Sequence, residues 1–363
     1  ALPLGLLALD FWPLGRFGAA GMRRLVREKL PLLGLAAVAA GLVIASRGDV
    51  SLDAGDLPRI PLGLRLANIP VACLRYVGKF LWPQDLSVYY PFPSSLPAEQ
   101  WAGSAAVLLA VLALAWLARK RAPCLPAGLA WFLVMLAPAA GVVQTGLWPA
   151  LADRFAYLPM VGLAAIVPFG LTALLPGRRG LAVALTTSLV LGHFALGAWA
   201  QARLWASGVD LFGQAARLAP QDPVSRHNLG MALLHEGRAE EALAKFGEAR
   251  DLAPSYVRPR IMAGDALLRL MEYPGAVTAF REALAREASS RDARVGLAEA
   301  LAGAGKPQAA AEEFARVLAT HPGDVQARMG LARVLLEQGE NAAALRVLAE
   351  MSGRGPVPAR ADA

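Results

Sequence analysis

The stretch HNLGMALLHEGRAEEALAKFGEARDLAP, residues 227–254, decides the fold of the second half of this 363-residue chain. Small residues and one phenylalanine hold fixed places in it, and the pattern returns in phase every 34 residues in three further copies. A period of this length predicts a pair of helices in each copy, stacked on the pair that follows. The residues in phase are Leu229, Gly230, Gly237, Ala242, Phe246, Ala249 and Pro254, then Gly264, Ala276, Phe280 and Ala283, then Leu297, Leu301, Gly305, Ala310, Phe314 and Pro322, and finally Leu331, Leu335, Gly339 and Ala344.

The pattern is the signature of the tetratricopeptide repeat, in which small residues stand where paired helices touch and an aromatic residue fills the space between them. It predicts an α-solenoid over residues 206–351, with a degenerate half-repeat at 206–220 leading into it and a disordered tail at 352–363. Such arrays commonly hold an extended peptide on their concave face. Our candidates for a peptide-binding groove are His227, Asn228, Asp265 and Glu299, with a merely solvated helix face as the alternative.

Residues 1–205 contain apolar runs that are too long for an ordinary soluble core. A helix that spans a membrane needs about 20 mostly apolar residues. The sequence therefore predicts an all-α protein, in which a multi-span transmembrane helix bundle over 1–205 is followed by the tetratricopeptide α-solenoid. The candidate spans are 1–9, 30–46, 102–118, 125–143, 155–175 and 180–200.

The basic residues predict which side of the membrane each connection faces. Clusters at Arg16–Lys29, Arg119–Arg121 and Arg178–Arg179 favour the cytoplasmic side. The spans alternate correctly only if 64–82 does not cross, so that stretch is expected to form an interfacial or re-entrant helix. Residues 47–101, 144–154 and everything after 200 then lie outside. We expect an integral protein of the bacterial inner membrane with its repeats in the periplasm.

Charge and composition exclude several classes of function. The net charge is +8, and residues 1–205 hold 17 Lys and Arg against 8 Asp and Glu, whereas 206–363 hold 19 against 20. The basic excess belongs to the apolar part, so membrane lipid is an expected partner and nucleic acid is not. No metal-ligand spacing or glycine-rich nucleotide loop occurs, so we expect neither a metal nor a bound cofactor. The chain starts without Met inside an apolar run, from which we expect an upstream part to be missing.

Asp153 and Arg154 stand together immediately before the apolar run 155–175. The predicted topology places Arg154 outside and at a helix N-terminus, where both the charge bias and the helix dipole disfavour a cation. In one interpretation Asp153 caps the helix and neutralises Arg154 locally. In the other, the forked guanidinium of Arg154 binds the phosphate of a lipid-linked donor.

The external connection before residue 94 supplies further candidates. Arg75 and Lys79 are one helical turn apart, so both could join Arg154 in attracting a phosphate, or they could bind lipid head groups without chemistry. Tyr89, Tyr90 and Phe92 form an aromatic group that is either part of an interfacial belt or, with Asp153, the wall of a donor or acceptor pocket.

Five segments occur in an order that resembles a known family. They are LLALDFWPLGR (6–16), EKLPLL (28–33), RYVGKFLWPQDLSVYYPFP (75–93), AGLAWFLVMLAPAAGVVQTG (127–146) and ALADRFAYLPMVGL (150–163). This order, followed by tetratricopeptide repeats, is similar to the transmembrane and tetratricopeptide-repeat proteins related to protein O-mannosyltransferases. The resemblance implies a glycosyltransferase that uses a polyprenyl-phosphate sugar as donor. It also implies that the catalytic acid lies upstream of residue 1, so no catalytic residue can be named.

The sequence leads to two hypotheses of function. In the first, the protein transfers a sugar, such as mannose, from a polyprenyl phosphate to Ser or Thr hydroxyls of a protein acceptor that the repeats hold. In the alternative, it is a non-catalytic scaffold anchored in the membrane, whose repeats bind other proteins of the cell envelope.

Overall fold

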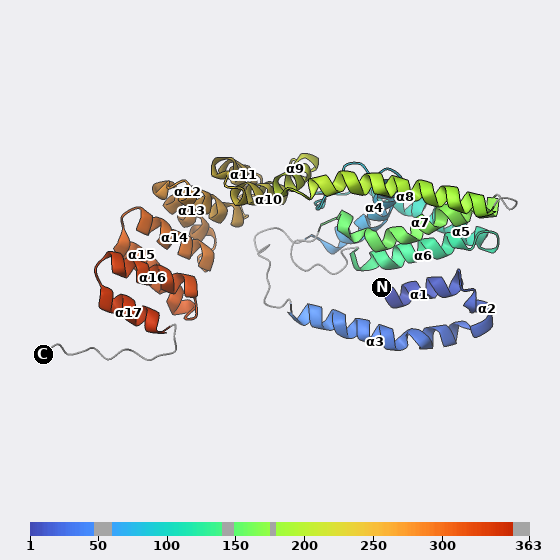
Figure 1. Ribbon diagram of the computed structural model, residues 1–363, viewed down its shortest axis with the longest axis horizontal. Coiled ribbons are helices and arrows are strands. Elements are labelled where there is room, and N and C mark those ends of the chain that lie inside the picture. Colours follow the sequence, from blue (N-terminus) through green and yellow to red (C-terminus); the bar gives the residue numbers. More distant parts are fainter. Residues whose placement is uncertain (47–59, 140–148, 175–178, 351–363) are drawn as a thin grey trace. The chain divides into compact units, whose positions relative to one another are not determined.

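The computed structural model describes residues 1–46, 60–139, 149–174 and 179–350 (Figure 1). Within these residues all regular elements are helices, and one isolated antiparallel bridge joins Tyr90 to Leu151. The chain divides into two compact units, 1–219 and 220–363. The predicted tail at 352–363 lies outside the described residues.

The first unit contains nine α-helices among its described residues. Helices α4 to α7 surround a core that includes Phe80, Phe132 and Leu163. Helices α6 and α7 approach most closely at Gly128 and Gly162, where the backbone of each occupies the space that a side chain on the other would need. Glycine is therefore required at both positions. The helices are α1 Leu2–Phe11, α2 Arg16–Ala20, α3 Met22–Ser46, α4 Leu62–Leu81, α5 Ala98–Leu117, α6 Cys124–Leu136, α7 Tyr157–Leu174, α8 Arg179–Leu204 and α9 Gly208–Leu218.

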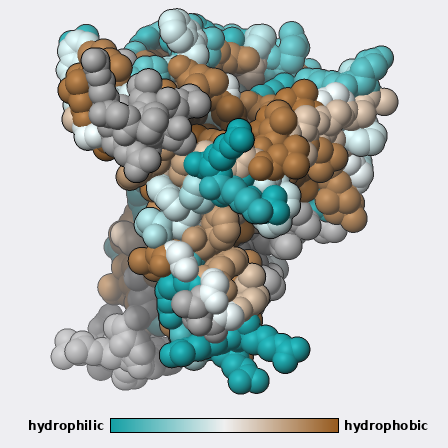
Figure 2. Space-filling model, turned by 90° about the vertical axis from the view of Figure 1, so that its right-hand side faces the viewer, coloured by the Kyte–Doolittle hydropathy of each residue, from teal (hydrophilic) through white to brown (hydrophobic). Residues whose placement is uncertain are grey.

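Two helical stretches of the described residues are long and apolar enough to cross a membrane, Ala98–Lys120 and Val183–Leu204. The apolar helices Leu2–Phe11, Cys124–Ala139 and Tyr157–Leu171 are shorter, and a bundle with more than two spans stays a prediction. Large apolar side chains are nevertheless widely exposed on this unit, and Figure 2 shows broad hydrophobic areas beside hydrophilic ones. Examples are Leu35 on α3, Leu109 and Leu117 on α5, and Leu189 and Leu196 on α8.

The described residues of the second unit, 220–350, form four helix pairs in the predicted phase. Phe246, Phe280 and Phe314 are completely buried at the same place in three successive pairs. Phe280 lies against both Gly264 of its own pair and Gly296 of the next, so a single ring packs two repeats together. The pairs are α10 Pro223–His235 with α11 Ala239–Leu252, α12 Arg258–Arg269 with α13 Tyr273–Arg286, α14 Arg291–Gly303 with α15 Pro307–Thr320, and α16 Val325–Glu337 with α17 Asn341–Ala349.

The ends of these helices follow the same period. Asp222, Ser290 and Asp324 are the N-caps of α10, α14 and α16, and each side chain accepts a hydrogen bond from the backbone three residues later. The turn inside each pair has a residue with positive φ, which is glycine at 237, 305 and 339 but Met271 in the second pair. The periodic residues that the sequence analysis identified therefore do determine both the core and the turns.

Candidate functional site

The site predicted in the first unit is built where two connections meet helix α4. At the bridge between Tyr90 and Leu151, the Tyr90 nitrogen donates to the Leu151 carbonyl oxygen at 3.1 Å, and the Ala150 nitrogen donates to the Tyr90 carbonyl oxygen at 2.9 Å. Two buried side chains of α4 hold the second connection: Asn68 donates to the carbonyl oxygen of Ala150, and the hydroxyl of Tyr76 bonds both backbone groups of Ala152, each at 3.0 Å. Buried backbone groups need hydrogen-bond partners, and these bonds supply them at Ala150 and Ala152. They thereby fix the backbone immediately before Asp153.

Asp153, Tyr90 and Lys79 form one hydrogen-bonded network at this place. The Asp153 Oδ2 atom accepts from the backbone nitrogen of Ser87 at 2.5 Å and lies 2.9 Å from the Tyr90 hydroxyl. The Lys79 ammonium donates to that hydroxyl at 2.7 Å and to the carbonyl oxygen of Asp85 at 3.1 Å. Three of the residues proposed from sequence are therefore in contact, although they come from three separate segments.

Burial sets the electrostatics of this network. It raises the pKa of the Asp153 carboxyl, and the nearby Lys79 charge opposes that shift. It also raises the pKa of the Tyr90 phenol, with the Asp153 charge acting in the same direction. The Asp153 Oδ1 atom is buried and has no hydrogen-bond partner. The network thus holds a carboxyl group whose charge is only partly compensated.

Arg154 lies next to this network but is not part of it. Its side chain is exposed, its Nη1 donates to the carbonyl oxygen of Val88 at 3.0 Å, and its guanidinium stands 4.9 Å from the centre of the Phe155 ring. Among the described residues no ion pair joins it to Asp153, whose carboxylate bonds to Ser87 and Tyr90 instead of capping a helix. The structure therefore does not contain the predicted helix cap by the Asp153 side chain.

The other candidates of the first unit lie around the same network. Arg75 is exposed on α4 one turn before Lys79, close enough for its charge to act on that ammonium. Tyr89 is half-buried, and Phe92 packs against the apolar core of the unit. Ser87, Tyr76 and Asn68 were missed by the sequence analysis because their role depends on contacts with residues more than 60 positions away.

The candidate groove in the second unit involves the first helices of the pairs. Each first helix from α10 to α14 contacts the first helix of the next pair, so α10, α12, α14 and α16 form a continuous row among the described residues. The first helices therefore form the closer-spaced inner layer of the solenoid. Asp265 on α12 and Glu299 on α14 occupy equivalent positions on this layer, one period apart.

These two carboxylates are close enough to interact. The pKa of Asp265 is raised to about 6, mainly by burial and secondly by the charge of Glu299. Glu299 accepts a 3.1 Å hydrogen bond from the side-chain amide of Gln326 on the next first helix. Asp265 has no ion pair within 4 Å among the described residues. The inner layer thus carries a negative patch, Asp265 and Glu299, which the nearby charge of Arg269 compensates only in part.

His227 and Asn228 behave differently from this pair. The His227 ring is 7% exposed and packs against the rings of Phe246 and Tyr256, at 5.7 and 5.5 Å between centroids. Burial lowers its pKa to about 4, and the charge of Arg258 adds to the effect. His227 is therefore a core residue rather than part of a groove surface, because the rings of the second helix and the following turn cover it. Asn228 is half-buried on α10.

Comparison with protein families identifies repeats in the second unit of the chain. Two tetratricopeptide-repeat family models match, over residues 261–320 and 301–363, so these repeats are present in that region. Among the described residues no group of three or more His, Cys, Asp or Glu side chains is arranged to hold a metal ion. No curated protein sequence matches the chain.

Several solved structures are similar to part of this chain. Residues 41 to the end of MamA from Desulfovibrio magneticus RS-1 are 18% identical, with 40% of this chain and 82% of that chain covered and a TM-score of 0.38. YrrB, described as a tetratricopeptide-repeat protein with an unusual peptide-binding site, is 22% identical, with 40% and 76% covered and a TM-score of 0.36. The second such domain of human RPAP3, in complex with an HSP70 peptide, is 22% identical, with 31% and 93% covered and a TM-score of 0.30.

Proposed function

We propose that the repeats of this protein bind an extended, basic segment of a partner polypeptide on the inner layer of the solenoid. The observation that carries this proposal is the pair Asp265 and Glu299, two carboxylates on successive first helices that form no ion pair within 4 Å in the part of the chain that the structure describes. A lysine or arginine side chain placed between them would be attracted to both and would neutralise one of the two negative charges. The matched repeat families and the general use of such solenoids for peptide recognition support a protein partner.

The test uses the full chain and a labelled peptide with lysine at every second position, compared with the same peptide carrying glutamine. The double variant Asp265→Asn with Glu299→Gln is expected to bind the lysine peptide about tenfold or more weakly, since each charge-assisted hydrogen bond contributes about 1.5–3 kcal/mol. Glu312→Gln is the control, because Glu312 is exposed on α15, a second helix. Equal binding by the double variant, or by the two peptides, would contradict the proposal.

A second candidate function is sugar transfer from a polyprenyl-phosphate donor, as the resemblance implies. The observation that favours it is the meeting of Lys79, Tyr90 and Asp153 beside the exposed Arg154 and Arg75. In this proposal Arg154, with Lys79, stabilises the leaving phosphate, a general base accepts the hydroxyl proton of the acceptor, and Asp153 with the aromatic residues forms the pocket wall.

This candidate has its own test on the full-length protein in membranes. Arg154→Ala is expected to abolish transfer from a polyprenyl-phosphate mannose while the protein still inserts, and Arg121→Ala serves as the control on the side predicted to be cytoplasmic. Unchanged transfer by Arg154→Ala would reject the phosphate role. Protease added to spheroplasts should digest the repeats, and protection of the repeats would overturn the predicted sidedness.

A further inference from the structure

One arginine recurs at the same place in all four repeats. The residues are Arg226, Arg260, Arg294 and Arg328, each in the first helix of its pair and each one period from the next. Every one of them donates a hydrogen bond to a backbone carbonyl oxygen immediately before its helix, on Pro220, Tyr256, Ala288 and Pro322 respectively. The common task of these arginines is therefore to fix the chain where it enters each repeat.

In three repeats the second helix or its end supplies a carboxylate to this arginine. Arg226 lies 3.3 Å from Glu248, and Arg294 lies 3.1 Å from Glu313. Arg328 lies 4.0 Å from Glu350. Each guanidinium thus has an anionic partner inside its own repeat, as expected for a charge that is partly withdrawn from water.

Arg260 is the exception. It is 8% exposed, yet among the described residues no carboxylate lies within 4 Å of it, and its one hydrogen bond goes from Nη1 to Tyr256, at 3.1 Å. Burial lowers the pKa of its guanidinium, and the charge of Arg286 acts in the same direction, whereas the charge of Glu282 opposes the shift without reversing it. Glu282 stands at the position equivalent to Glu248 and Glu350 and lines the same pocket, but among the described residues it forms no ion pair within 4 Å of Arg260.

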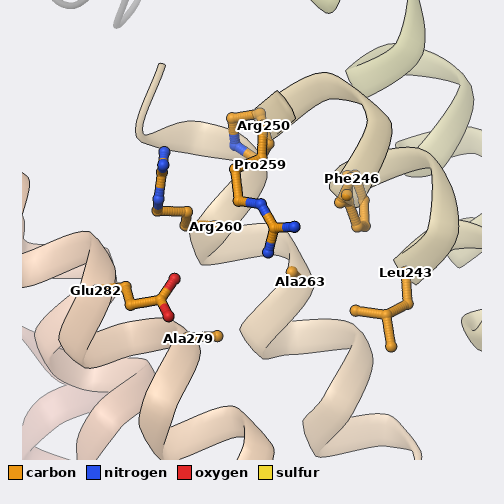
Figure 3. Close-up of a pocket in the computed structure, with 9 residues that line it drawn as sticks. Leu243, Phe246, Arg250, Pro259, Arg260, Ala263, Ala279 and Glu282 are labelled. Carbon is orange, nitrogen blue, oxygen red and sulfur yellow. The ribbon is translucent and has the colours of Figure 1, made fainter. Parts of the chain in front are cut away.

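A pocket of about 240 Å³ lies beside this guanidinium, between α11, α12 and α13. Figure 3 shows Arg250, Arg260 and Glu282 around it, with Leu243 and Phe246 on the α11 side. The space exists because Ala263 stands where the other repeats have Leu229, Leu297 and Leu331. Gly247 adds to it, since a side chain there would meet nothing within 4 Å.

The chemistry of the pocket selects its ligand. A buried guanidinium keeps several N–H donors in a fixed fork that matches a carboxylate, and an unpaired buried charge is costly. Sites for small molecules usually measure about 300–1,000 Å³, so this pocket suits one side chain or one chain end rather than a metabolite. We propose that the pocket binds a single carboxylate group of a partner polypeptide, with Arg260 as its hydrogen-bond donor and Leu243 and Phe246 as its apolar wall.

This site is separate from the negative patch of the inner layer. Arg260 and Asp265 are five residues apart on α12, which places them about 140° apart around the helix. The two sites also select opposite charges. A partner segment that places an acidic group in the pocket therefore does not compete with a basic segment on Asp265 and Glu299.

Three labelled hexapeptides test the proposal by fluorescence anisotropy on the full chain. The first has a central glutamate and an amidated end, the second has glutamine instead, and the third has glutamine with a free terminal carboxylate. We expect the first or the third to bind, which identifies the source of the carboxylate, and the second to bind about tenfold or more weakly. Equal binding of all three peptides, or of none, would overturn the proposal.

Two variants assign that binding to the pocket. Arg260→Gln removes the donor, and Ala263→Leu fills the space with the residue that the other repeats carry there, so it should fold and still lose the peptide. Arg294→Gln is the matched control, because that arginine faces Glu313 in another repeat and should leave binding unchanged. Wild-type binding by Ala263→Leu would show that the peptide binds elsewhere, which refutes the site. The double variant of Asp265 and Glu299 should bind the peptide as the wild type does.

Discussion

The phenol of Tyr90 lies 2.9 Å from the carboxylate of Asp153, a residue 63 positions later in the chain. This contact joins the connection after α4 to the connection before α7, and it occurs where the backbone bridge of Tyr90 and Leu151 brings the two together. A polar contact between two half-buried groups therefore holds the candidate site of the first unit in place.

Tyr90→Phe is expected to lower the thermal midpoint of the full chain. The change removes the hydroxyl that bonds both Asp153 and Lys79, so two partly buried polar groups lose a partner, at a cost of about 1–3 kcal/mol. Tyr157→Phe is the control, because Tyr157 is 72% exposed, and it should change stability by less than about 0.5 kcal/mol. Equal midpoints for the two variants would show that the network does not contribute to stability.

The stability of the second and third repeats should depend on pH through Asp265. Its pKa in the folded protein is about 6, above the ordinary 3.8, so the folded state holds the proton more tightly. The protonated carboxyl therefore adds to the free energy of unfolding fully below about pH 4, and this contribution is lost as the pH rises to about 6. Its upper limit is about 3 kcal/mol, which solvent screening of the partly exposed side chain reduces. Asp265→Asn should remove this loss, as measured by hydrogen exchange of α12 and α14.

His227 should produce the opposite dependence in the first repeat. Its folded pKa of about 4 lies below the ordinary 6.5, so the unfolded chain binds the proton more tightly and stability is lost as the pH falls from about 6.5 to about 4. His227→Phe keeps the ring packing against Phe246 and Tyr256 and should abolish that acid sensitivity. Unaltered acid sensitivity of α10 and α11 in hydrogen exchange would contradict this account.

Met271→Gly should stabilise the protein. Met271 has a φ of 57° at the turn where the other three repeats have glycine, and its side chain is 72% exposed, so the change removes backbone strain and little packing. The expected gain is about 0.5–1 kcal/mol, because glycine adopts this conformation without the steric cost of a side chain. Met329→Gly, inside α16, should instead cost about 1 kcal/mol in urea unfolding.

Gly296→Ala should destabilise the contact between the second and third repeats. A methyl group at this position overlaps the ring of Phe280, which is completely buried, and overpacking of a core costs about 1–3 kcal/mol. Gly247→Ala provides the comparison, since a methyl group there meets nothing within 4 Å and favours the helix. If both variants unfolded at the same urea concentration, Phe280 would not be the tight contact described.

The period of 34 residues was sufficient to predict the second unit because each repeat makes the same local contacts. Phe246, Phe280 and Phe314 are buried as the pattern predicts, and the glycines at 237, 305 and 339 form the expected turns. His227 was misplaced because the period shows which helix carries a residue but not that the Tyr256 ring, from the following turn, covers it. The empty space at Ala263 likewise becomes visible only when three helices are packed together.

The candidate site of the first unit was predictable only as a set of residue types. Lys79, Tyr90 and Asp153 were proposed from charge, aromatic character and position along the chain, and the structure brings them into contact. Their hydrogen bonds could not be predicted, because they depend on the pairing of Tyr90 with Leu151, and a single bridge between two irregular segments has no periodic pattern. The number of spans and the side of the membrane remain predictions from the distribution of charge.

The double contact of Phe280 has a consequence for how the solenoid can change in length. The ring packs on Gly264 within its own repeat and on Gly296 of the next one, and Phe314 meets Gly330 in the same way. If residues 257–290 were excised, Phe246 would occupy the place of Phe280 against Gly296, and the carbonyl of Pro254, one period before Ala288, would take the place of the partner of Arg294. Whole repeats can therefore be duplicated or deleted during evolution, because each new neighbour offers the same packing surface.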